Sequence, residues 1–174
     1  GKIEPIEVCK EKAERNKLFS VKWSKDVEER NKLWKARHDV YLSVKALKPN
    51  ARVYATDACV PITELAECIK FAEKEIQDLS LKAPIVGHVG DGNFHVTVLY
   101  DPENKDDFEI IRNFSNKLVR KTLELGGTST GEHGIGLNKK AYLLQEHPSS
   151  INLMKSIKKT IDPNNIMNPG KIFD

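Results

Sequence analysis

Glycine and histidine concentrate in one segment of this chain. Eight of its ten glycines and three of its five histidines lie between Gly87 and Gly136. Glycine lets the backbone approach a ligand closely, and histidine is the commonest metal ligand and general base among side chains. Their coincidence predicts a site in this segment that binds a ligand and transfers protons.

The first group of these residues, Gly87 to His95, is typical of a hairpin with a histidine on each arm. The run Gly90-Asp91-Gly92-Asn93 has the composition of a turn. Folding back at this turn brings His88 and His95 onto neighbouring strands. Strand alternation then puts Phe94 on one face and His95 on the other, away from the apolar core. A hydrogen-bonded structural pair of histidines fits the same pattern.

The second group, Thr128 to Gly136, places a carboxylate and an imidazole on a glycine-rich loop. These are Glu132 and His133. Two imidazoles and a carboxylate suit Zn, Mn or Fe(II) and leave coordination positions open for a substrate. His88, His95 and Glu132 are therefore candidate ligands, and His133 remains as a base. A solvated turn is the alternative, and by residue type alone a metal-dependent hydrolase explains these ligands as well as an oxidoreductase does.

The elements that position these groups follow from the periodicity of apolar residues. The order strand, helix, hairpin, helix, strand predicts an α+β fold, a ferredoxin-like antiparallel sheet with helices on one face. A helix capped by Ser24 precedes it and ends at Pro49, and two short helices and an irregular tail follow it. The expected strands are 52–56, 84–89, 94–100 and 128–130, and the expected helices between them are 61–76 and 108–125.

Composition narrows the class of protein. Hydrophobic residues make up 39% and charged residues 30% of 174 residues, with a net charge of +3, which predicts one soluble domain over residues 1–174. Lysines are scattered among glutamates, so no basic stripe for nucleic acid is expected. No apolar run reaches the ~18 residues of a membrane span. Three cysteines without a C-x-x-C pair argue against a disulfide framework or a thiolate zinc site.

Three motifs, in the same order and spacing, resemble the C-terminal domain of FAD-linked oxidases. They are Gly87 to His95, Gly131 to Gly136, and the tail segment Asp162 to Lys171. That family includes D-lactate, D-2-hydroxyglutarate and glycolate dehydrogenases. The resemblance runs from about Trp34 onward and does not include the family's FAD-binding domain. It implies the substrate- and metal-binding part of a larger flavoprotein, a part expected to be inactive alone.

The resemblance implies roles for four residues of the two glycine-rich motifs. His88, His95 and Glu132 match the ligands of a divalent metal, Zn or Mn. His133 matches the base that lies between substrate and flavin. A bound cation lowers the pKa of a hydroxyl, neutral His133 takes its proton, and a hydride passes to FAD.

Three residues outside those motifs also match positions of the family. Arg37 matches the arginine that binds the substrate carboxylate, although by itself it is typical of a helix surface. Asn168 and Lys171 lie in the tail that runs toward the flavin domain in relatives. They are matched to FAD binding.

The resemblance also favours one substrate. Relatives that oxidise 2-hydroxyglutarate carry a lysine at the position of Ala55 and an asparagine at that of Thr97. The segment Tyr54 to Pro61 looks like the lactate branch instead. We therefore expect a mitochondrial protein that oxidises D-lactate and passes electrons to an acceptor such as cytochrome c. Glycolate, D-2-hydroxyglutarate, and a non-catalytic metal-binding module are the alternatives.

Overall fold

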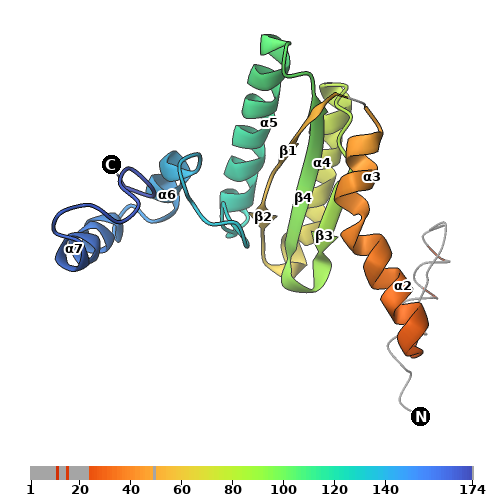
Figure 1. Cartoon of the computed structure of the whole chain (residues 1–174), viewed down its shortest axis with the longest axis horizontal. Coiled ribbons are helices and arrows are strands. Elements are labelled where there is room, and N and C mark those ends of the chain that lie inside the picture. Colours follow the sequence, from red (N-terminus) through yellow and green to blue (C-terminus); the bar gives the residue numbers. More distant parts are fainter. Residues whose placement is uncertain (1–10, 12–14, 16–23, 49, 174) are drawn as a thin grey trace. The chain divides into compact units, whose positions relative to one another are not determined.

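The computed structural model describes residues 11, 15, 24–48 and 50–173 (Figure 1). It divides into two compact units, residues 1–43 and 44–174. In the first unit, helix α2 (Val27–His38) begins after Asp26, whose carboxylate accepts the Glu29 N–H at 2.9 Å. The predicted cap, Ser24, was wrong by two residues, because a charged acceptor suits the positive end of a helix. At Asp39 α2 ends and α3 (Val40–Ala46) follows, so the expected long helix is divided in two.

The larger unit is built around strand β4 (Asn93–Tyr100), which pairs antiparallel with each other named strand. On one side lies β3 (Ile85–His88). On the other side lie β1 (Arg52–Ala55) and β2 (Ala58–Cys59). Ala55 stands opposite Thr97 and Ala58 opposite Phe94, so β1 and β2 share one register. They form one line of chain whose ladder is interrupted at the two residues between them.

The sheet confirms the predicted ferredoxin-like arrangement, with one correction. The expected strand 128–130 is reduced to a single bridge between Thr128 and Cys59, at the edge of β2. The β3–β4 hairpin is present and turns through the 3-10 helix η2 (Val89–Asp91). Gly92 completes the turn at φ +71°, and a Cβ there would lie 2.0 Å from the Val60 carbonyl oxygen, so this position requires glycine.

Helices α4 (Leu65–Asp78) and α5 (Lys105–Glu124) cover one face of the sheet (Figure 1). The short helix η1 (Ile62–Glu64) leads into α4. Alternate residues of β4 point into this layer and are fully buried with Phe114 of α5: Phe94, Val96 and Val98. The predicted alternation is thus confirmed, and it sets His95 and Thr97 on the opposite face.

Two shorter helices follow, α6 (Lys140–Glu146) and α7 (Ile151–Ile161). Asp162, directly after α7, is 5% exposed and organises the tail. Its carboxylate accepts the N–H groups of Ile166 and Met167 at 3.0 and 2.9 Å and also contacts Lys158. Among the described residues, no helix has the length and apolar character needed to cross a membrane.

Candidate metal centre

His95 is held in one orientation by the backbone of the neighbouring strand. Its Nδ1 lies 2.8 Å from the carbonyl oxygen of Thr56. A carbonyl only accepts, so Nδ1 carries the proton and the Nε2 of the neutral ring presents its lone pair. The side chain is only 11% exposed. His95 is therefore a preorganised nitrogen ligand on the face of β4 that lies opposite the core.

Glu132 meets that lone pair from a distant part of the sequence. Its Oε1 lies 2.7 Å from His95 Nε2, 3.9 Å from His88 Nε2 and 3.7 Å from His133 Nε2. Two acceptor atoms 2.7 Å apart require a proton or a cation between them. Ligands that share one Zn ion stand about 3–3.5 Å apart, since each lies about 2.1 Å from it.

The cluster of His88, His95 and Glu132 therefore fits a divalent cation. All three offer a ligand atom within 4.8 Å of the others. His88 and Glu132 are 38% and 45% exposed, so the cluster is buried on the side of His95 and open on the other. The arrangement can hold an ion and still admit a small oxygen ligand. The sequence predicts that the hairpin brings the two histidines together and that the loop supplies the carboxylate. In the structure the three side chains lie close together.

His133 lies beside the cluster rather than within the first set of ligands. Its ring centroid is 5.3 Å from that of His95, and its side chain is 63% exposed. It also forms a second possible ligand group with Asp57 and His95, whose ligand atoms lie within 4.8 Å of one another. An exposed imidazole at this distance can exchange protons with a molecule bound at the cluster.

Asp57 is the residue of this site that the sequence reasoning missed. It interrupts the line of β1 and β2 opposite His95, and it is 4% exposed. Its Oδ2 accepts hydrogen bonds from Thr130 Oγ1 at 2.9 Å, from two backbone N–H groups and from Lys139 Nζ at 3.2 Å. The N–H groups are those of Glu132 at 3.2 Å and His133 at 3.0 Å. The available signal was an aspartate directly after the expected strand 52–56, next to a segment type in which aspartate is depleted.

The carboxylate of Asp57 is kept charged despite its burial. Burial alone would raise its pKa, but the His133 N–H, the Thr130 hydroxyl, the Glu132 N–H and Lys139 together lower that pKa well below the ordinary value. Its second oxygen, Oδ1, has no hydrogen-bond partner among the described residues and lies 3.9 Å from His95 Nδ1. The lowered pKa and this distance place an ionised carboxylate next to the His95 ring.

Packing also fixes the loop that carries Glu132. Gly131 lies against the side chain of Asn93 in β4, and a Cβ at Gly131 would stand 2.7 Å from Asn93 Cγ. Asn93 is 5% exposed, so it has little room to move. On the other side of the loop, the Ser129 N–H and hydroxyl donate to Glu146 at 3.0 and 2.9 Å.

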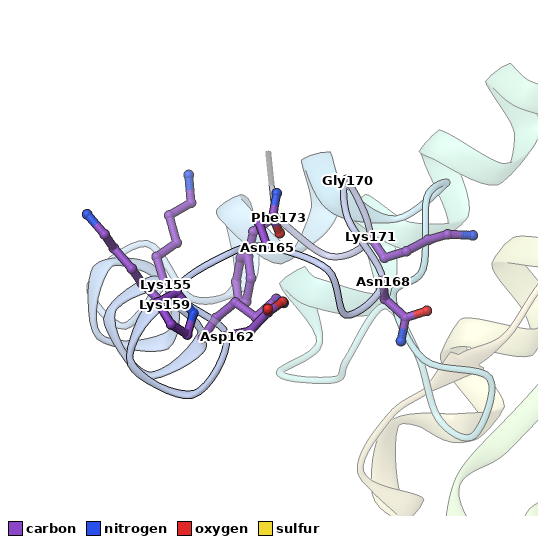
Figure 2. A pocket seen from close by; sticks show the side chains of 10 residues that line it. Lys155, Lys159, Asp162, Asn165, Asn168, Gly170, Lys171 and Phe173 are labelled. Atoms are coloured by element: carbon purple, nitrogen blue, oxygen red, sulfur yellow. The ribbon is translucent and has the colours of Figure 1, made fainter.

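The remaining predicted site residues belong to other elements of the chain. Arg37 is half-buried on α2, in the first compact unit. Asn168 and Lys171 line a cavity of about 310 Å³ in the tail, and neither the three cluster residues nor His133 borders it. Figure 2 shows Asn168 and Lys171 on one side of this cavity and Lys155 and Lys159 on the other. The cavity is therefore lined mainly by cationic and amide groups, together with the carboxylate of Asp162.

Comparison with known proteins gives one consistent family. The sequence profile of "FAD linked oxidases, C-terminal domain" matches residues 3–172. A probable mitochondrial D-lactate dehydrogenase of Danio rerio is 42% identical over 172 residues, which are 98% of this chain and 35% of that protein. A mitochondrial D-lactate dehydrogenase (cytochrome) of Arabidopsis thaliana is 35% identical over 98% of this chain and 30% of its own length.

A relative with another named activity matches equally widely. The glycolate oxidase subunit GlcD of Bacillus subtilis is 37% identical over 99% of this chain and 37% of its own length. The chain thus spans about a third of the curated relatives it matches. Among solved structures, a 4-ethylphenol oxidase from Gulosibacter chungangensis shares the fold, with a TM-score of 0.55 and 20% identity over 86% of this chain and 31% of that one. The profile match and these identities establish that the chain belongs to the FAD-linked oxidases and forms their C-terminal domain.

Proposed function

We propose that this chain is the substrate- and metal-binding domain of a flavin-dependent dehydrogenase that oxidises D-lactate to pyruvate. The observation that carries the proposal is the meeting of His88, His95 and Glu132, from a hairpin and a distant loop, in the C-terminal domain of an FAD-linked oxidase. Such a donor set suits Zn or Mn, and FAD would be the acceptor of the substrate's hydride. A metal-dependent hydrolase, which the residue types alone left open, does not account for the family.

The three ligands divide the work of holding a cation. His95 supplies a lone pair that its Nδ1–H···O=C bond to Thr56 keeps aimed at Glu132. Glu132 supplies negative charge, and His88 supplies a second imidazole from the facing strand. When bound, a divalent cation attracts the carboxylate and hydroxyl oxygens of a 2-hydroxyacid and lowers the pKa of that hydroxyl.

His133 is the proposed base. A neutral imidazole is a common general base, because one of its ring nitrogens can accept a proton. Its backbone N–H is tied to Asp57, while its ring remains 63% exposed on the open side of the cluster. A substrate hydroxyl at the cluster would therefore lie within reach of this ring, and the proton would leave through a group exposed to solvent.

The sheet beside His95 supports a small substrate. Thr97 lies two residues beyond His95 on the same face of β4, and Ala55 stands directly opposite Thr97 in β1. Cross-strand neighbours of this kind share one face of a sheet. The methyl group of Ala55 and the hydroxyl of Thr97 offer no charge to a second carboxylate, which favours D-lactate over D-2-hydroxyglutarate. Glycolate, which is smaller still, remains the second candidate, because a glycolate oxidase subunit matches nearly the whole chain.

The other predicted roles complete the proposal. Arg37 would bind the substrate carboxylate through its guanidinium. Asn168 and Lys171 would contact FAD from the tail. Electrons would pass to an acceptor such as cytochrome c in mitochondria, the compartment named for the relatives from Danio rerio and Arabidopsis thaliana.

Metal titration of the chain tests the first part of this proposal. Isothermal titration calorimetry with Zn²⁺ and Mn²⁺ should give one site for the chelator-treated protein. Loss of an outer hydrogen-bond partner of a ligand typically weakens metal binding by about 10–100-fold. Glu132→Gln alters a ligand itself and should weaken binding by more than that. Glu109→Gln, which alters an exposed glutamate of α5, should change nothing. Absence of binding, or equal binding by both variants, would contradict the metal centre.

A substrate panel tests the second part. The chain alone should give no turnover, whereas the protein joined to its flavin-binding portion should reduce FAD with D-lactate faster than with glycolate or D-2-hydroxyglutarate. The double change Ala55→Lys and Thr97→Asn should move the preference toward the diacid. Stoichiometric metal without D-lactate oxidation by the flavin-containing protein would favour a non-catalytic metal-binding module instead.

A further inference from the structure

Asp57 stands where three parts of the larger unit meet. It lies between β1 and β2, it faces His95 across the sheet, and it binds the loop that carries Glu132 and His133. Nearly buried carboxylates are rare unless their charge is compensated. Four donors on a single oxygen, Oδ2, supply that compensation here.

The four donors on Oδ2 are far from Asp57 in the sequence but close to one another in it. Thr130, Glu132, His133 and Lys139 are separated from Asp57 by 73 to 82 positions. The N–H groups of Glu132 and His133 are adjacent, so one oxygen fixes the backbone of both residues at once. No described helix or strand contains this part of the loop, which makes the carboxylate its principal backbone anchor.

The other oxygen of Asp57 has a different role. Oδ1 is buried and without a hydrogen-bond partner among the described residues, and it lies 3.9 Å from His95 Nδ1. That separation exceeds a hydrogen bond, so Oδ1 does not compete with Thr56 for the His95 proton. Its negative charge lies beside the His95 imidazole, where it would favour a cation at the cluster without being one of the three ligands.

From this geometry we infer that Asp57 is the positioning residue of the metal centre, the group that holds the Glu132–His133 backbone against the hairpin so that three ligands converge. The inference rests on the proposed function for its metal but not for its backbone contacts. Removing the carboxylate releases two amide groups, lets Glu132 move away from His95 and subtracts one negative charge. Outer hydrogen-bond partners of metal ligands typically change metal affinity by about 10–100-fold.

The structure provides a matched control for this residue. Asp162 is also nearly buried and also accepts two backbone N–H groups and a lysine, in the tail rather than at the cluster. Asp57→Asn and Asp162→Asn therefore remove the same chemistry from two places. A second test variant, Thr130→Val, removes one of the four donors to Asp57, together with the contact of that hydroxyl with the Gly134 carbonyl, and leaves the carboxylate in place.

The experiment measures two quantities in the full 174-residue chain: Zn²⁺ affinity by calorimetry and amide hydrogen exchange by nuclear magnetic resonance. We expect Asp57→Asn to weaken Zn²⁺ binding about 10–100-fold and to speed exchange at the Glu132 and His133 amides. Thr130→Val should produce smaller changes in the same direction. Asp162→Asn should leave both quantities at the cluster unchanged.

The outcomes separate this inference from the proposed function. If the parent chain binds Zn²⁺ and Asp57→Asn binds it equally well, the positioning role is wrong while the metal centre stands. Equal losses in Asp57→Asn and Asp162→Asn would indicate general destabilisation and would also overturn it. If the parent chain binds no Zn²⁺, the proposed metal centre fails, and unchanged exchange at Glu132 and His133 would then refute the positioning role independently. Should Asp57→Asn not fold, Thr130→Val decides by the same two measurements.

Discussion

At the scale of single residues, the candidate site depends on carboxylates that accept hydrogen bonds from the backbone of the glycine-rich loop. Glu146 on α6 is an example away from the cluster, because its carboxylate accepts the Ser129 N–H and hydroxyl. Burial alone would raise the pKa of Glu146, but hydrogen bonds from Thr128 and Ser129 outweigh it and lower that pKa below the ordinary value. A lowered native pKa stabilises the fold above the pKa of the unfolded state, about 4.3, and this contribution disappears as the pH falls through the native value.

We therefore expect Glu146→Gln to lower the free energy of unfolding by about 1–2 kcal/mol at pH 7. The difference from the parent protein should shrink as the pH is lowered below about 4. Urea denaturation at pH 7 and pH 3.5 measures it. Glu103→Gln, which changes an exposed glutamate before α5, should show no effect at either pH. A difference that grows in acid would contradict the hydrogen-bonding argument.

The close packing of Gly131 against Asn93 leaves no room for a larger side chain at position 131. Gly131→Ala should displace the loop, because the new Cβ would stand 2.7 Å from Asn93 Cγ. Overpacking of this kind typically costs about 1–3 kcal/mol. Gly90→Ala is the control, since a Cβ there meets nothing within 4 Å and its φ is not positive. Thermal unfolding and Zn²⁺ titration should both separate the two variants, and equal behaviour would show that Asn93 yields to the new side chain.

At the scale of elements, the interruption between β1 and β2 leaves a backbone oxygen of the sheet available to hold a candidate metal ligand. Where the ladder breaks, the Val96 N–H donates to the Thr56 hydroxyl oxygen at 2.9 Å instead of to a backbone oxygen. The Thr56 carbonyl is thereby left for His95 Nδ1. One threonine thus serves both neighbours with two different oxygens.

Thr56→Val should leave the buried Val96 N–H without an acceptor and cost about 1–3 kcal/mol. Thr56→Ser keeps the hydroxyl and should retain most of the stability. Urea denaturation of the two variants gives the comparison, with the slope of the transition as a check that the unfolded state is unchanged. Similar midpoints for Thr56→Val and the parent protein would show that water replaces the hydroxyl.

The elements also mark what the sequence alone can predict. The β3–β4 hairpin was predictable, because its turn composition and its alternation are local features, and His88 and His95 came with it. The strand expected at 128–130 was wrong, because only Thr128 reaches the Cys59 backbone while Ser129 turns to Glu146. Asp57 was missed because its hydrogen-bond donors lie at least 73 positions away, and no local pattern records such a pairing.

At the scale of the whole molecule, the chain consists of two compact units, and the entire cluster lies in residues 44–174. Metal binding should therefore be a property of this unit. A fragment of residues 44–174 should bind Zn²⁺ within about threefold of the affinity of the full chain, since no described ligand or anchor is removed. Calorimetry compares the two, with circular dichroism to verify that the fragment is folded. A loss of tenfold or more would show that the first unit contributes to the site.

The three candidate ligands come from two separate segments of the chain. His88 and His95 come from one hairpin, whereas Glu132 arrives 37 positions after His95. The unfolded chain can offer the hairpin pair, but only the completed fold can offer all three ligands. An ion that prefers the complete set shifts the folding equilibrium by mass action, so the melting temperature should rise with metal concentration and fall when a chelator is added. Binding of the ion would thus report whether the β3–β4 hairpin and the loop that carries Glu132 have come together in the fold.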